Sequence, residues 1–238
     1  MIFWNTICKT KNISFIYLKT KNSMKSILLL ISLIFIPMYN TIAQTDAKAI
    51  KILDNVSAQT KKNGATQIEL NFITAAKAIG MPAPQKWKIL TFNNKFRMDM
   101  GDQVIYCDGK TIWRYLKADN EVEINDYVED ANTLSPTNIF SIYKKQFKAQ
   151  YMKEEKNNNT LCDYIELYPL VPKKKSYSII KLFINKAKQQ MQEMQIKNKD
   201  GSTLTYSIQK IVPNVKITDT DFIFDATKYP KVQINDLR

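Results

Sequence analysis

The side chains best suited to acid–base or metal chemistry are carboxylates gathered in residues 121–130. Two carboxylates held close together can act as general acid and general base, or can share a hard cation. Glu121 and Glu123 alternate with Val122 and Ile124, however, which is typical of a strand with one polar and one apolar face. A solvent-facing strand is the simpler interpretation, and a hydrolase working through Glu121 and Glu123 is the alternative. The stretch also contains Asp126, Glu129 and Asp130.

The complete absence of histidine excludes several classes of site. Ser-His and Cys-His catalysis, imidazole metal ligands and histidine pH switching all need the missing side chain. Asp219, Asp221 and Asp225 lack the glycine-turned loop that frames a calcium ion. The chain, with five glycines, contains neither a G-x-S-x-G motif nor a glycine-rich phosphate loop. We therefore expect no enzymatic activity, no metal and no cofactor.

Two cysteines, Cys107 and Cys162, lie downstream of residue 43. Both stand in strand-like runs, where an isolated cysteine is usually a small buried apolar side chain. An oxidising compartment would allow the two thiols to pair. The sequence leaves a disulfide open and favours two free, buried thiols.

Residues 94–128 carry the clearest structural pattern of the chain. Apolar residues alternate with charged ones from position 95 to position 100, which indicates a strand with one wet and one dry face. Three turn-forming segments divide the rest into short runs, so that four strands are expected in total. Asp108-Gly109 is the strongest hairpin signal, with positive φ expected at both positions. The stretch therefore predicts an antiparallel meander.

The chain on either side of the meander predicts further strands and two helices. One helix is expected over residues 47 to about 61, capped by Thr45 or Asp46. A second is expected to begin at Ser135 and to bury an apolar face that includes Phe147. Further strands are expected at 66–79, 86–91, 150–155, 161–168, 176–185, 190–198 and 203–211, followed by an extended tail. The prediction is a mainly β domain of about eleven antiparallel strands.

The space between this sheet and its helices has two equally good interpretations. One is a plain core in which the side chains of sheet and helices fill the space. The other is a cavity, because a long antiparallel sheet tends to curl, and a curled sheet too wide for its own side chains encloses a hollow. Flexible Met98 and Met100 beside Phe96 and Trp113 would suit acyl chains.

The first 43 residues have the features of a targeting segment. Met24-Lys25 precedes an aliphatic run at 26–37, and Thr41-Ile42-Ala43 resembles a small-residue cleavage site. We expect a secretory signal peptide cut after Ala43, residues 1–23 as an upstream extension, and one domain over 44–238.

The charge balance of the chain is strongly basic. The formal charge is +13, and removing the five lysines of residues 1–43 leaves +8. That excess suits either solubility or an anionic membrane surface. Export from the cytoplasm argues against nucleic acid as a partner.

An ordered set of short motifs spans most of residues 46–238. In chain order these are KFRM at 95–98, DGKTIWRY at 108–115, LSP at 134–136, FSIYKK at 140–145, FIFD at 222–225, YP at 229–230 and INDLR at 234–238. The set resembles the periplasmic outer-membrane lipoprotein carrier family, LolA, and in particular a short-chain branch of it. The resemblance implies an incomplete antiparallel β-barrel covered by helices that act as a lid.

The same resemblance implies a role in the periplasm. A monomeric carrier would receive lipoproteins from an inner-membrane ABC-type release complex, shield their acyl chains and pass them to an outer-membrane acceptor. Well-described members of the family carry an Arg-Pro pair, just before the strand matching 95–100, whose arginine bonds to the lid. Phe92-Asn93-Asn94 stands there in this chain, so no residue is assigned to a lid latch.

Under this hypothesis the sheet supplies the wall of an acyl-chain cavity and the second helix supplies part of its lid. The expected wall residues are Ile68, Leu70, Phe72, Phe96, Met98, Met100, Trp113 and Tyr115, and the expected lid residues are Ile139, Phe140 and Tyr143. Two alternatives remain. One is an envelope hydrolase using Glu121 and Glu123, and the other is a non-transport lipid-binding or structural module of the envelope that docks through its basic surface.

Overall fold

The structure, a computed structural model, describes residues 46–76, 82–128 and 138–238, all within one compact unit, Gln44–Arg238. The expected signal peptide in residues 1–43 and the expected helix start at Ser135 lie outside the described residues. None of the helices within these ranges is long and apolar enough to cross a membrane.

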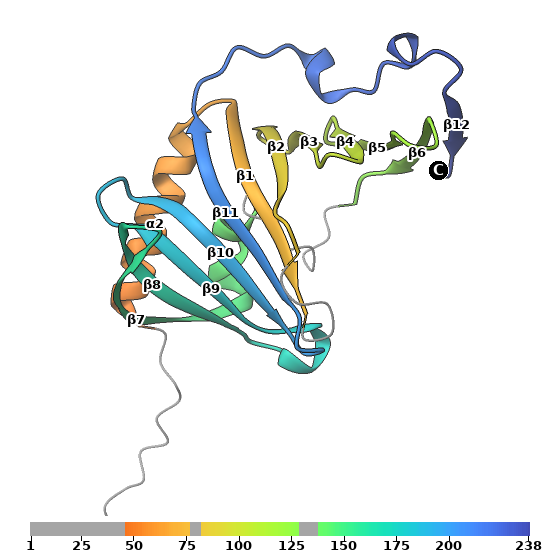
Figure 1. The fold of residues 1–238 in the computed structure, drawn as a ribbon. Coiled ribbons are helices and arrows are strands. Elements are labelled where there is room, and N and C mark those ends of the chain that lie inside the picture. Colours follow the sequence, from red (N-terminus) through yellow and green to blue (C-terminus); the bar gives the residue numbers. More distant parts are fainter. Residues whose placement is uncertain (1–45, 77–81, 129–137) are drawn as a thin grey trace, which may run out of the picture. The chain divides into compact units, whose positions relative to one another are not determined.

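In the described residues, twelve strands form a single sheet that is not closed, with β7 (Phe147–Asn157) and β12 (Gln233–Asp236) as its two edges (Figure 1). The order across the sheet is β12-β6-β5-β4-β3-β2-β1-β11-β10-β9-β8-β7. The other strands are β1 (Thr66–Ala75), β2 (Gln85–Phe92), β3 (Lys95–Asp99), β4 (Gln103–Cys107), β5 (Thr111–Leu116), β6 (Glu121–Asp126), β8 (Thr160–Pro169), β9 (Tyr177–Asn185), β10 (Gln190–Asn198) and β11 (Thr203–Val212). The predicted mainly β, antiparallel fold with two helices is confirmed.

The twelfth strand is a correction to the expected eleven. β12 lies in the tail that was expected to be merely extended, and it pairs with β6 in parallel, whereas all other neighbouring strands are antiparallel. Three short 3-10 turns also interrupt the chain after β8 and along the tail: η1 (Pro172–Lys174), η2 (Asp219–Phe222) and η3 (Ala226–Lys228).

Both helices lie on the same side of the sheet, behind it in Figure 1. Helix α2 (Ala47–Lys62) begins as predicted, because the Asp46 carboxylate accepts hydrogen bonds from the backbone N–H groups of Lys48 and Ala49. Helix α3 (Ile139–Gln146) ends before Phe147, which was expected to lie on its apolar face. Phe147 has an extended backbone and starts β7, so its ring reaches the core from a strand rather than from the helix.

The sheet has an apolar core on each face, over different strands. On the face that contacts α2 and α3, called here the helix face, side chains from β1, β2 and β7–β11 bury Leu53 of α2 and Ile139 of α3. On the opposite, outer face, a smaller core over β4–β6 packs under Phe224 and Tyr229 of the tail. The buried side of the chain therefore changes face between β3 and β4.

The β4–β5 hairpin forms where it was predicted, but with a different turn. Gly109 has a φ of +91°, whereas Asp108 is not in the positive-φ region. The Asp108 side chain instead accepts hydrogen bonds from the N–H groups of Lys110 and Thr111, both at 2.8 Å. An aspartate that caps its own turn in this way replaces the expected two-residue geometry.

Cys107 and Cys162 are free, and both are buried. Burial raises the pKa of each thiol, to about 11 for Cys162. The favoured prediction of two small buried side chains is confirmed.

Candidate functional site

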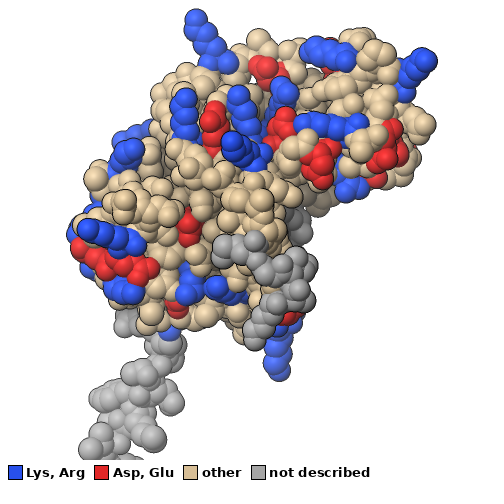
Figure 2. All heavy atoms as spheres, in the orientation of Figure 1, with Lys and Arg blue, Asp and Glu red and all other residues tan. Residues whose placement is uncertain are grey.

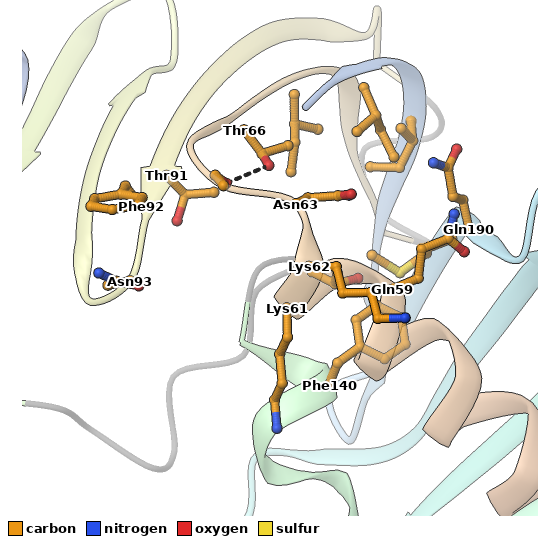
Figure 3. A pocket seen from close by; sticks show the side chains of 16 residues that line it. Gln59, Lys61, Lys62, Asn63, Thr66, Thr91, Phe92, Asn93, Phe140 and Gln190 are labelled. Atoms are coloured by element: carbon orange, nitrogen blue, oxygen red, sulfur yellow. Dashed lines mark hydrogen bonds between the residues drawn. The ribbon is translucent and has the colours of Figure 1, made fainter. Parts of the chain in front are cut away.

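A pocket of about 360 Å³ opens on the helix face where the last turn of α2 approaches the sheet (Figure 3). Its walls come from α2, the α2–β1 loop, β1, β2, β10, β11 and one residue of α3. The lining residues are Gln59, Thr60, Lys61, Lys62, Asn63, Gly64, Thr66, Ile68, Thr91, Phe92, Asn93, Phe140, Gln190, Met191, Ile208 and Ile211. The lining comes from separate stretches of the chain, residues 59–68, 91–93, 140, 190–191 and 208–211, which the fold brings together.

The floor of the pocket is apolar. Ile68 of β1 lies directly opposite Ile211 of β11, so both side chains leave the sheet on the helix face. The β-bulge after Glu69 then brings Ile208 opposite Leu70 on the same face. Phe140 of α3 contributes an aromatic wall above this floor (Figure 3). The pocket therefore offers aliphatic and aromatic surface to a ligand.

The rim of the pocket is polar and basic. Lys61 and Lys62 close the last turn of α2, where cations complement the negative end of the helix dipole. The next loop is fixed by the tail, because the Gly64 N–H donates a hydrogen bond to Asn214 Oδ1 at 3.0 Å. Thr66 Oγ1 donates to the Gly64 carbonyl at 3.0 Å (Figure 3). An apolar floor under a cationic rim fits an amphiphilic ligand.

The two helices are tied to each other. The Tyr143 hydroxyl donates a hydrogen bond to Asp54 Oδ1, and Lys144 Nζ lies 2.6 Å from the same oxygen. Ser57 Oγ donates to the Phe140 carbonyl at 3.1 Å. The hydrogen bond from Lys144, and then that from Tyr143, hold the pKa of Asp54 below its ordinary value. Burial and the bond to Asp54 raise the pKa of Tyr143.

Sequence reasoning missed Asp54. The sequence pattern assigns this residue no role, and nothing in its neighbourhood signals a partner 89 residues away. The contact supplies a connection between the covering helices in a chain that lacks the Arg-Pro pair.

Seven of the predicted site residues share one apolar cluster on the helix face. Ile68, Leu70, Phe72, Met98, Ile139, Phe140 and Tyr143 all belong to that cluster or pack against it. Only two of them, Ile68 and Phe140, line the pocket. Leu70 and Ile139 are fully buried within the cluster, so they support the floor and the helix rather than face the hollow.

Phe96 and Met100 lie near this cluster without lining the pocket. Phe96 shares the helix face with Met98 and has its ring 6.0 Å from that of Tyr127, edge to face. Met100 follows the end of β3, and its N–H donates to the Gln103 carbonyl in the turn.

The predicted placement of Trp113 and Tyr115 on the same wall is wrong. The register pairs Arg97 with Tyr106, and Tyr106 with Trp113, so these three side chains project from the outer face. Phe96 and Met98, which alternate with Arg97, project from the helix face. Tyr115 packs at 4.3 Å between ring centroids against Tyr229 of the tail. Alternation within one strand fixes which residues share a face, but it does not fix which face the next strand presents.

Glu121 and Glu123 of β6 are engaged in contacts with the neighbouring strands β12 and β5. Glu123 accepts a hydrogen bond from Arg114 Nε at 2.8 Å, and Glu121 accepts one from Asn235 Nδ2 of β12 at 3.5 Å. Neither carboxylate lines the pocket. As predicted, they lie opposite Val122, which is buried on the outer face. Among the described residues, no group of three or more acidic or cysteine side chains could hold a metal ion.

A solved structure with a similar fold supports the architecture. An uncharacterized conserved protein from Thermus thermophilus superposes with a TM-score of 0.52 at 13% identity, covering 79% of this chain and 99% of its own. A LolA superfamily protein from Nitrosomonas europaea gives a TM-score of 0.40 at 11% identity, covering 74% of this chain and 97% of its own.

Comparison of sequences places the chain in a family. An uncharacterized protein from Methanocaldococcus jannaschii is 24% identical over 170 residues, which are 70% of this chain but only 48% of that relative. The chain thus spans about half the length of that relative. The model of the family described as outer membrane lipoprotein carrier protein LolA matches residues 93–225, more than half of the chain. The short-chain branch stays a prediction, but the chain itself belongs to the LolA family.

Proposed function

We propose that this protein is a periplasmic carrier that binds the acyl chains of lipoproteins in the pocket between the last turn of α2 and the sheet, and moves them from the inner to the outer membrane. The observation that carries the proposal is the apolar floor formed by Ile68, Ile208 and Ile211 beneath Phe140. A ligand with a fatty tail would bury that tail there and leave its polar end at the lysine rim.

The size of the pocket limits how much of an acyl chain it can bury. About 360 Å³ lies near the lower end of the range for ligand sites, about 300–1000 Å³. Each methylene buried is worth about 0.8 kcal/mol, so even part of one chain gives useful affinity. A cargo with several chains needs more space, which the helices can provide by moving away from the sheet together, since Asp54 ties them to each other.

Delivery requires that the affinity stay moderate. A carrier that takes cargo from an inner-membrane ABC-type release complex and gives it to an outer-membrane acceptor must release what it binds. We expect the carrier to act as a monomer. The polar rim keeps the entrance of the pocket hydrated, which limits the apolar area that a bound acyl chain can bury.

The experiment compares two glutamates on the same strand. Ile211→Glu places a carboxylate on the floor, and Gln209→Glu places one at an exposed position two residues earlier. Uptake of a fluorescent fatty acid and of purified lipoprotein is measured for both, with circular dichroism to verify folding. We expect binding to fall about tenfold or more for Ile211→Glu and to be unchanged for Gln209→Glu. Equal binding by a folded Ile211→Glu protein would refute the acyl-chain pocket.

A further inference from the structure

A second pocket, of about 400 Å³, lies on the outer face of the sheet, where the tail passes over β1, β2 and β3. Its lining residues are Gln67, Lys88, Leu90, Arg97, Asp99, Val215, Lys216 and Asp221. None of them lines the pocket at the last turn of α2. The view of this face in Figure 2 shows basic and acidic side chains mixed along its upper part.

Arg97 is the most informative side chain of this pocket. Its guanidinium carbon lies 5.2 Å from the centroid of the Tyr106 ring, and the Tyr106 hydroxyl is held at 3.1 Å from that of Tyr229 in the tail. No acceptor for a hydrogen bond from the guanidinium is found within the described part of the chain. A guanidinium stacked on a ring is pre-oriented, and its N–H groups can bind an oxyanion in bidentate fashion.

Two lysines add to the positive charge. Lys88 comes from β2 and Lys216 from the tail, and both are exposed. Neither has a carboxylate at ion-pair distance in residues 46–76, 82–128 and 138–238. The three cations therefore come from three separate segments that meet only in the folded chain.

The two carboxylates of the pocket are already engaged. Asp99 lies 2.9 Å from Lys117 Nζ and accepts the Gly101 N–H at 3.1 Å. Asp221 accepts the N–H and the hydroxyl of Thr218 at 2.7 and 3.0 Å. Their charges weaken the local positive potential, although one oxygen of each is engaged within the chain, Asp99 Oδ1 with Lys117 and Gly101, and Asp221 Oδ2 with Thr218.

The tail is held over the strands by contacts outside the cation cluster. Lys95 Nζ lies 2.7 Å from Asp219, and the Val215 N–H donates to the Ala65 carbonyl at 2.9 Å. The backbone that carries Lys216 and Asp221 is thereby held in place before any ligand arrives. A site whose groups are fixed in advance loses less entropy when it binds.

We propose that this second pocket is a binding site for a phosphate group, with Arg97 as the bidentate donor and Lys88 and Lys216 as flanking cations. A phosphate could come from a lipid headgroup or from a soluble phosphate compound, and the chemistry of the contact is the same. This site is separate from the acyl-chain pocket and does not depend on it.

The first arm of the test uses soluble anions. Pyrophosphate and inorganic phosphate are titrated into the full protein by calorimetry at low ionic strength. Binding is compared with that of Arg97→Gln, of the double variant Lys88→Gln/Lys216→Gln, and of Lys173→Gln, which removes one charge from the exposed η1 turn. We expect Arg97→Gln and the double variant to bind about tenfold more weakly or worse, and Lys173→Gln to bind as the wild type does.

The second arm uses vesicles of phosphatidylcholine with or without phosphatidylglycerol. Selective binding to the vesicles that contain phosphatidylglycerol, lost in the same variants, identifies a lipid phosphate, whereas binding in the first arm alone identifies a soluble one. The proposal is overturned if neither probe binds, or if the double variant binds like Lys173→Gln. The double variant changes only exposed side chains, so a folding defect in Arg97→Gln would not prevent a decision.

Discussion

The Tyr143 hydroxyl of α3 donates a hydrogen bond to the Asp54 carboxylate of α2, and this contact joins the two helices that cover the sheet. Lys144 reinforces it at 2.6 Å from the same carboxylate oxygen. The helical cover of the sheet, α2 and α3, is therefore held together by contacts between its two helices. The helices are expected to rise from the apolar floor as one body when a larger cargo enters.

Removing this contact should loosen the cover. We expect Tyr143→Phe to lower the free energy of unfolding by about 1 kcal/mol and Lys144→Gln by less, because an exposed ion pair contributes little. Both should release a bound fluorescent fatty acid faster than the wild type, as measured by stopped-flow displacement. Lys145→Gln, which removes the same charge from the next residue, is the control.

A release rate in Tyr143→Phe that matches that of Lys145→Gln would contradict the idea of a joined cover. Urea unfolding of the same proteins separates a loss of stability from a change in release.

The Asp54 carboxylate also makes stability depend on pH. Its pKa in the folded protein lies below its ordinary value of 3.8, first because of Lys144 and then because of Tyr143. The stabilisation is therefore fully present above about pH 3.8 and is lost as the pH falls through the lowered pKa. We expect Asp54→Asn to melt earlier than the wild type at pH 6, with the difference shrinking toward pH 2.5. A constant difference over that range would assign the effect to packing.

The two faces of the sheet should respond differently to truncation. Tyr115→Ala opens a cavity in the core under the tail, where the ring contacts Phe224 and Tyr229. We expect it to lose about 3 kcal/mol of stability and to keep its affinity for a fluorescent fatty acid. Ile68→Ala, on the pocket floor, should weaken that affinity. Thermal melts and probe titrations below the melting range measure both, and weaker binding by folded Tyr115→Ala would place the ligand elsewhere.

Two glycines with almost the same backbone offer a matched test of crowding. Gly109 has a φ of +91° and Gly101 one of +94°, so alanine is strained at both. A Cβ on Gly109 would lie 2.4 Å from Asn94 Nδ2, whereas one on Gly101 would meet open space. We expect Gly101→Ala to cost about 1 kcal/mol, and Gly109→Ala clearly more. Adding Asn94→Ala should recover the excess; if it does not, crowding by Asn94 is not the cause.

Much of the fold could be predicted because its signals are local. Asp46 is a good N-cap wherever it stands, and the alternation around Phe96 marks a strand whatever its neighbours are. The strand β12 escaped prediction because its four residues are all exposed and have no buried face to detect.

The candidate site could be predicted only in part, because its geometry depends on register and on distant contacts. Ile68 and Phe140 were found as apolar members of regular elements. Trp113 was assigned to the wrong face, since nothing within β5 reveals that the tail covers its apolar side. Arg97 looks like an ordinary exposed strand residue until Tyr106 and Lys216 are placed beside it.

The central position of β1 in the sheet also affects the order in which the chain folds. β1 pairs on one side with β2, which follows it closely, and on the other with β11, whose Tyr206 faces Phe72 across 134 positions of chain. Closing so long a loop is slow, so the segment β1–β6 and the segment β7–β11 can each gain order before the two are joined. The β1–β11 pairing contributes Ile68, Ile208 and Ile211 to the pocket floor, so we expect the pocket to form only when the two segments are joined.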